Sequence, residues 1–129
     1  MSDKVMYPTW IVRANCNQGK KVFSTEGLDK YGSLELELNL SIDAKQATTF
    51  LNIIGLEIVN GKVFKDGDFD DTIFTCEMAF KEVTGIYGDG ERKLRVIFKD
   101  RNFKYPWEEG CEELYKSQIE ITENKSYLC

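Results

Sequence analysis

The most regular arrangement of metal-binding residue types lies in the acidic segment from Asp66 to Glu77. Its carboxylates stand at positions one, three, five and twelve, the spacing of an EF-hand calcium loop, with Ile73 at position eight. Position six holds Asp71, although the sharp turn of such a loop requires glycine. The residues that follow are typical of a strand, whereas an EF-hand continues into a helix. We therefore interpret residues 66–71 as a solvated acidic turn and predict no metal site.

Neighbouring carboxylates are a second source of chemistry, because their pKa values can be driven apart to give an acid and a base. The candidate groups are Glu35 with Glu37, and Glu108, Glu109, Glu112 and Glu113. Glu35 and Glu37 alternate with leucines in a strand pattern, so we expect both on the solvent-facing side of a sheet, where charge keeps the sheet soluble. Because no pattern places either group in a pocket, we predict no catalytic role for them.

The chain contains no histidine. Its absence removes the most common general base near neutral pH, the usual nitrogen ligand of zinc, and every imidazole-dependent triad or dyad. We therefore predict no catalytic residues and no cofactor. An enzyme that relies only on carboxylates, lysine or cysteine is the least favoured of the function classes that we consider.

The cysteines are far apart and form no C-x-x-C pair: Cys16, Cys76, Cys111 and Cys129. In a chain that we place in the cytoplasm, this spacing predicts free thiols. We expect Cys76 in the core. Cys16 and Cys111 lie near predicted loops, and either could react only with help from a lysine or a helix terminus.

The segment from Phe98 to Trp107 interleaves aromatic and basic residues, a combination that can stack on bases or grip an acidic partner. Its candidate binding residues are Lys99, Arg101, Lys104, Tyr105 and Trp107. The competing interpretation is that Phe103 and Trp107 close the end of the core.

Charge and hydropathy limit the partners. The chain has 17 basic and 22 acidic residues, a net charge of -5 that would repel a nucleic-acid backbone. The acidic residues are mixed with basic ones, without the long blocks that are typical of a nucleic-acid mimic. The opening residues, MSDKVMYPTW, contain no signal-peptide pattern, and no apolar run approaches the roughly 18 residues that cross a bilayer. We expect a cytoplasmic protein with no membrane partner.

The elements that must position these residues indicate a single α+β domain over residues 1–129. We expect strands at residues 5–14, with Pro8 at an edge, and at 20–25, joined by a turn at 15–19. The alternation of Leu34, Leu36, Leu38 and Leu40 with polar residues predicts a third strand with one face in the core.

A capping box at Asp43 and Gln46 begins a helix that we expect to reach Ile58. Further strands are predicted at 62–65, at 72–84 with both faces in the core near its middle, and at 94–99, after a loop at 85–91. Residues 119–129 form a frayed tail or an edge strand. The predicted architecture is an antiparallel or mixed sheet of about five to six strands with one main helix on one face.

Three stretches, FSTEGLDKYGSLELELNL, VFKDGDFDD and LRVIFKDRNFKYPWEEG, occur in this order and together resemble the bacterial domain-of-unknown-function family numbered four-two-six-two. The resemblance covers about residues 5–110, and its most specific part is a D-x-x-x-x-[FY]-P-W segment from Asp100 to Trp107. Members carry a T-x-G-L turn, matched here from Thr25 to Leu28, and then a Gly-His-Pro-Glu-like stretch, replaced here by Gly32 to Glu35. The resemblance implies a compact α+β domain of a bacterium or phage and supplies no known reaction. This chain lacks the family's histidine.

Small size, mild acidity, missing histidine and the aromatic-basic segment favour a non-enzymatic cytosolic binding protein. We expect it to act by occupying a protein partner, as an inhibitor, an immunity protein or a phage anti-defence protein does. The alternative is a nucleotide-like small molecule held between the helix and the loop from Asp100 to Trp107. In either case homo-oligomers are possible, because strand edges near Pro8 and the C-terminus could pair between copies.

Overall fold

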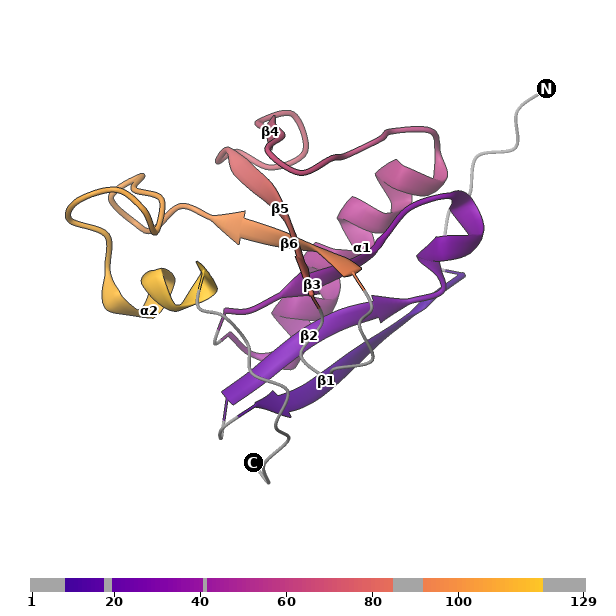
Figure 1. Cartoon of the computed structure of the whole chain (residues 1–129), viewed down its shortest axis with the longest axis horizontal. Coiled ribbons are helices and arrows are strands. Elements are labelled where there is room, and N and C mark those ends of the chain that lie inside the picture. The colour runs from indigo at the N-terminus through magenta and orange to yellow at the C-terminus, as the bar shows by residue number, and fades with distance from the viewer. Residues whose placement is uncertain (1–8, 18–19, 41, 85–91, 120–129) are drawn as a thin grey trace.

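The computed structural model describes residues 9–17, 20–40, 42–84 and 92–119 (Figure 1). The predicted α+β class is confirmed, with a six-stranded mixed sheet and one main helix. The strands are β1 (Ile11–Asn17), β2 (Lys20–Glu26), β3 (Glu35–Leu38), β4 (Phe69–Asp70), β5 (Met78–Thr84) and β6 (Arg92–Phe98). The helices are α1 (Ala44–Val59), the short α2 (Glu113–Lys116), and the 3-10 turns η1 (Leu28–Tyr31) and η2 (Ser117–Ile119).

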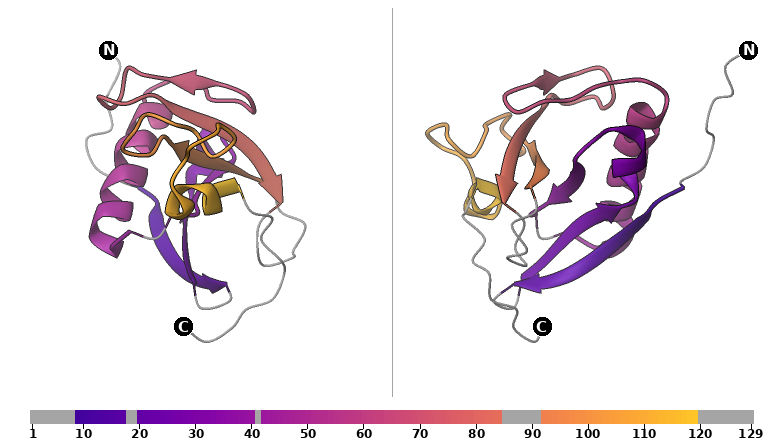
Figure 2. Two further views of the ribbon diagram at one scale, coloured as in Figure 1. Left: turned by 90° about the vertical axis from the view of Figure 1, so that its left-hand side faces the viewer. Right: turned by 45° about the vertical axis from the view of Figure 1, so that its right-hand side comes forward.

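The strand order is β1-β2-β3-β6-β5-β4, and only β3 and β6 run parallel. The chain between these two central strands contains α1, which packs along one face of the sheet (Figure 2). The expected N-cap is confirmed, because the Asp43 carboxylate accepts the N–H of Gln46 at 2.8 Å. Between helix and sheet lie the core residues, among them Phe23, Leu36, Leu38, Leu51, Ile54, Phe80, Leu94 and Val96.

Gly55 brings α1 close to the indole of Trp10. A Cβ at this position would lie 2.8 Å from Cε2 of that ring. The ring is also fixed by its Nε1, which donates to Asn52 Oδ1 at 3.1 Å. The absence of a side chain at residue 55 is therefore a packing requirement.

We expect Gly55→Ala to lower the free energy of unfolding by about 1 kcal/mol. Alanine favours a helix by about 1 kcal/mol, but overpacking a core typically costs about 1–3 kcal/mol. Thr49→Ala, on the exposed side of the same helix, should leave stability unchanged or raise it slightly. Urea denaturation of both variants measures the difference. A Gly55→Ala variant more stable than wild type would show that the Trp10 ring moves away from the new methyl group without cost.

Several strand boundaries differ from the expected ones. β1 begins at Ile11 and includes Asn15 and Asn17, which were expected in a turn, while Pro8 lies outside the described residues. Residues 62–65 are irregular. The acidic turn contains β4, and the strand expected from residue 72 starts only at Met78.

Residues 72–76 form a bend, and the Asp70 side chain takes the backbone donors of the first two. The carboxylate of Asp70 accepts the N–H groups of Thr72 and Ile73, at 2.8 and 3.1 Å, in place of a strand ladder. The expected burial of both faces of the following strand is confirmed at Met78, Ala79 and Phe80. The predicted loop at 85–91 lies outside the described residues, as does all but the first residue of the C-terminal tail.

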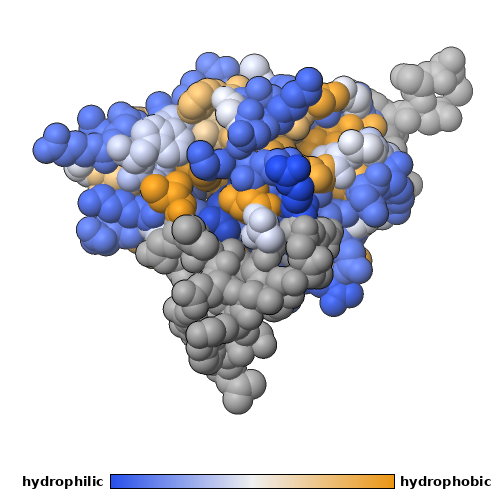
Figure 3. Space-filling model, viewed as in Figure 1, coloured by the Kyte–Doolittle hydropathy of each residue, from blue (hydrophilic) through white to orange (hydrophobic). Residues whose placement is uncertain are grey.

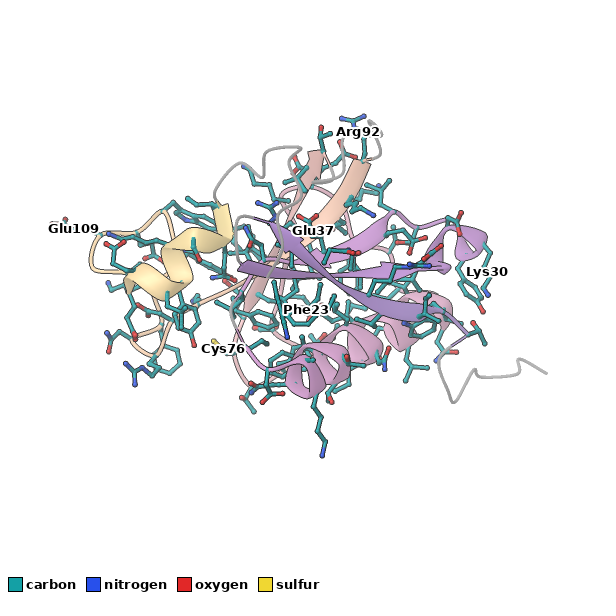
Figure 4. The ribbon with its side chains drawn as sticks, turned by 90° about the horizontal axis from the view of Figure 1, so that it is seen from below. Phe23, Lys30, Glu37, Cys76, Arg92 and Glu109 are labelled. Atoms are coloured by element: carbon teal, nitrogen blue, oxygen red, sulfur yellow. The ribbon has the colours of Figure 1, made fainter. Side chains whose placement is uncertain are left out.

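The prediction that Glu35 and Glu37 face solvent is wrong. Their exposed fractions are 6% and 1%, and all four residues of β3 are buried. Part of the second face of the sheet is covered by η2, from which the Gln118 side chain donates to the carbonyl of Phe98 and accepts its N–H, each at 2.8 Å. Figure 4 shows Phe23 between the sheet and α1, with Glu37 on the other side of the strands.

Candidate functional site

A mainly apolar groove lies on the sheet face opposite α1. We call it the aromatic groove; its volume is about 290 Å³, and it is lined by Asp66, Gly67, Phe69, Ala79, Phe80, Lys81, Ile97 and Trp107. Its floor follows from strand register, because Phe69 of β4 pairs with Ala79 of β5, and Ala79 pairs with Ile97 of β6. Three side chains from segments far apart in sequence therefore form one row across the sheet.

Trp107 forms one wall of the groove, and the buried Tyr105 supports it from behind. The rings of Tyr105 and Trp107 are stacked, with centroids 4.5 Å apart and planes inclined by 14°, and the ring centroids of Phe69 and Tyr105 are 5.6 Å apart with planes inclined by 62°. Tyr105 is 4% exposed, whereas Trp107 is 51% and Phe69 56% exposed. A buried tyrosine thus holds a half-exposed tryptophan in a fixed orientation.

Tyr105 is anchored by polar contacts on its far end. Its hydroxyl donates to Glu77 Oε1 at 2.9 Å, and the ammonium of Lys99 lies 5.0 Å from the ring centroid. Burial raises the pKa of Tyr105 well above its ordinary value, and the hydrogen bond to Glu77 raises it further. The phenol is therefore a neutral donor at every physiological pH.

Asp100 organises the loop that carries this wall. It is 3% exposed, and its carboxylate accepts backbone N–H groups of Asn102, Lys104 and Glu112 at 2.8–2.9 Å. Burial acts to raise the pKa of Asp100, but these hydrogen bonds outweigh burial and hold the pKa below its ordinary value. The aspartate of the D-x-x-x-x-[FY]-P-W segment thus has a structural role.

The structure brings together only part of the predicted binding set. Lys99, Tyr105 and Trp107 are neighbours, as described above. Arg101 instead forms a two-pronged ion pair with Glu112, at 3.0 Å for each hydrogen bond, and neither Arg101 nor the exposed Lys104 lines the groove. Tyr105 supports the surface instead of forming it.

The competing interpretation, that Phe103 and Trp107 close the core, is wrong, since they are 69% and 51% exposed. Sequence reasoning also missed Phe69 and Lys81 as groove residues. The sequence offers no local signal for Phe69, because an acidic turn surrounds it and only strand pairing places it beside Ala79.

The described cysteines differ from expectation. Cys111 is buried and its thiol donates to the carbonyl of Lys104 at 3.7 Å. Burial and the nearby Asp100 carboxylate raise the pKa of the Cys111 thiol, so it is not an activated nucleophile. Cys76 is partly exposed, not in the core. Both are free thiols, and the side chains of Cys16 and Cys129 lie outside the described part.

The carboxylates of the acidic turn do not converge. Asp66 accepts the N–H of Glu82 at 2.7 Å, Asp68 accepts that of Lys65 at 2.8 Å, and Asp70 pairs with Lys62 at 2.7 Å. Within the described ranges, no three His, Cys, Asp or Glu side chains are grouped as a metal ion would require. Backbone donors, one lysine and the Thr72 hydroxyl hold these carboxylates.

Two further hollows lie elsewhere. One, of about 370 Å³, is at the C-terminal end of α1 against Leu34 and Leu94, and the other, of about 610 Å³, is open and polar around Arg13 and Glu35. None of these three hollows lies between α1 and the loop from residue 100: the groove beside Trp107 opens on the opposite face, and no residue of α1 lines it.

Comparisons with protein-family models, curated proteins and solved structures gave no match to this chain. The resemblance to family four-two-six-two therefore stays a prediction. None of the helices in the described part is both long and apolar enough for a transmembrane span.

Proposed function

We propose that this protein is a non-enzymatic binding protein that occupies a partner protein by receiving one of the partner's apolar side chains in the aromatic groove. The observation that carries the proposal is the half-exposed Trp107 stacked on the buried Tyr105. Binding hot spots are enriched in tryptophan and tyrosine, and a ring that is already fixed loses little entropy on binding.

The size and chemistry of the groove support a protein partner over a nucleotide. Small-molecule sites usually measure about 300–1,000 Å³, so a hollow of about 290 Å³ suits a single side chain. Lys81 is the one cation in its lining, too little for a polyphosphate. On the coloured part of the surface in Figure 3, apolar residues form separate small patches among hydrophilic ones, a pattern compatible with one small anchoring site.

An inhibitor, an immunity protein or a phage anti-defence protein would work in this way, because each acts by covering a surface of its target. None of these roles requires a catalytic group. This agrees with the structural use of the buried carboxylates and of the Cys111 thiol.

Replacing Trp107 by alanine should weaken the complex by about 2–4 kcal/mol, which is about 30- to 1,000-fold in Kd. Tagged wild type and variant are compared by pull-down from lysate of the source cells, followed by titration with the captured protein. Phe103→Ala is the matched control, since Phe103 is a more exposed aromatic residue of the same loop and lies outside the groove. If wild type and Trp107→Ala capture equal amounts of the partner protein and have equal Tm, the groove is not the binding site.

A further inference from the structure

The two edges of the sheet differ in how far other residues cover their backbone donors and acceptors. On one side, β4 and the residues just before it cover β5: the N–H of Gly67 donates to the carbonyl of Phe80 at 2.8 Å, and the N–H of Phe80 donates to the carbonyl of Asp68 at 2.9 Å. Beyond β4, the Asp66 carboxylate takes the N–H of Glu82 at 2.7 Å. A short covering strand and a side-chain cap are common ways to stop further strand addition.

The other edge is β1, which has no such protection within the described residues. All seven of its residues pair with β2, and no described backbone group bonds to its outer side. The strand, IVRANCN, contains no proline or lysine, and its one charged residue is Arg13. Figure 1 shows β1 along the outside of the sheet. Among residues 9–17, 20–40, 42–84 and 92–119 nothing pairs with its outer row of donors and acceptors, and such a row is a template for strand pairing.

We propose that the outer edge of β1 pairs antiparallel with β1 of a second copy, so that the two sheets join into one continuous sheet across a two-fold axis. A second β1 offers a strand of equal length whose outer edge bonds to no described backbone group. In such an isologous interface the same segment supplies both sides.

Geometry and charge select the register. Residues directly opposite each other in a sheet point to the same face. The two-fold axis must therefore pass midway between one residue of β1 and the same residue of the second copy. An axis at Ala14, the middle residue, pairs all seven residues and sets Arg13 opposite Asn15 of the second copy. An axis at Arg13 would set two guanidinium groups directly opposite each other, which is destabilising. Ala14 is therefore the favoured centre.

The side chains of β1 fit this register. Arg13 already forms an ion pair with Glu26 of β2, so its positive charge is compensated before the second copy binds. Ala14 is exposed, and its small side chain can meet its own symmetry mate without a clash. Ile11, which is 53% exposed, is brought opposite Asn17 of the second copy.

A cysteine placed on the axis tests both the dimer and its register. In a Cys16→Ser background, Ala14→Cys should form a disulfide-linked dimer under mild oxidation, because directly opposed residues have the Cα separation that a disulfide needs. Arg13→Cys is the matched control: in this register its two thiols are offset by two residues, with Cα atoms about 8 Å apart, too far to bridge. Cross-linking of Arg13→Cys but not of Ala14→Cys, or of neither, overturns the proposal.

Sedimentation velocity supplies a readout that needs no cross-link. Wild type should form dimers as its concentration rises, and Ala14→Asp, which puts two carboxylates on the axis, should lose the dimer and keep its Tm. Trp107→Ala should dimerise as wild type does, which separates this edge from the aromatic groove. A wild type that stays monomeric at all concentrations, or that pairs only with an extended peptide, contradicts self-association through β1.

Discussion

Replacing Arg95 by methionine should lower the free energy of unfolding by about 3–5 kcal/mol, because the change leaves the Glu37 carboxylate buried without its guanidinium partner. Arg95 is 2% exposed and donates from Nε and Nη2 to Glu37 Oε1 at 2.9 and 2.6 Å. Its Nη1 donates to the carbonyl of Gln118 at 3.0 Å, so the same side chain holds η2 on the sheet.

The double change Glu37→Met with Arg95→Met should recover most of this loss, because neither position then carries a buried charge. Arg92→Met is the control, since its ion pair with Glu82 lies at the surface and should contribute about 0–1 kcal/mol. Urea denaturation of the variants measures each effect. An Arg95→Met variant as stable as wild type would mean that water reaches the Glu37 carboxylate.

Glu35→Gln should cost about 2–4 kcal/mol of stability. The carboxylate accepts hydrogen bonds from the hydroxyl of Thr25 at 2.9 Å and from the N–H groups of Gly27, Leu28 and Asp29 at 3.0–3.1 Å. An amide keeps one acceptor oxygen and turns its NH₂ group toward the remaining donors, and hydrogen bonds to charged groups contribute about 1.5–3 kcal/mol each.

Glu26→Gln is the matched control for this prediction, because Glu26 is exposed and belongs to the same turn. Amide hydrogen exchange gives a local readout: exchange at Leu28 and Asp29 should accelerate in Glu35→Gln and stay unchanged in Glu26→Gln. Unchanged exchange in both variants would show that the backbone of η1 is held without the carboxylate.

The same contacts explain the Thr25-Glu26-Gly27-Leu28 turn. The Thr25 hydroxyl donates to Glu35 and accepts the N–H of Leu36 at 2.9 Å, which ends the ladder between β2 and β3. Gly27 has a φ of 120°, and a Cβ there would lie 3.1 Å from that of Trp10. A glycine is therefore needed for both the backbone conformation and the close approach.

Local patterns in the sequence were sufficient for the elements whose formation depends on neighbouring residues. The capped helix α1 follows from Asp43, Gln46 and apolar residues at helical spacing, and the pairing of the first two strands was expected, although β1 begins and ends later than predicted. The leucine face was also correct, since Leu36, Leu38 and Leu40 are all buried against the core. In each case a period of 3.6 or 2 determines which side chains share a face.

What lies on the second face of the sheet was decided only by tertiary structure. Glu35 and Glu37 have the alternation of solvent-facing residues, and their burial depends on η1 and on residues 113–119, which pack there from far along the chain. The aromatic groove likewise depends on pairing that sets Phe69 beside Ala79 and Ile97. Periodicity reports which residues share a face, but not what covers that face, because the covering segment is selected by long-range packing and hydrogen bonding.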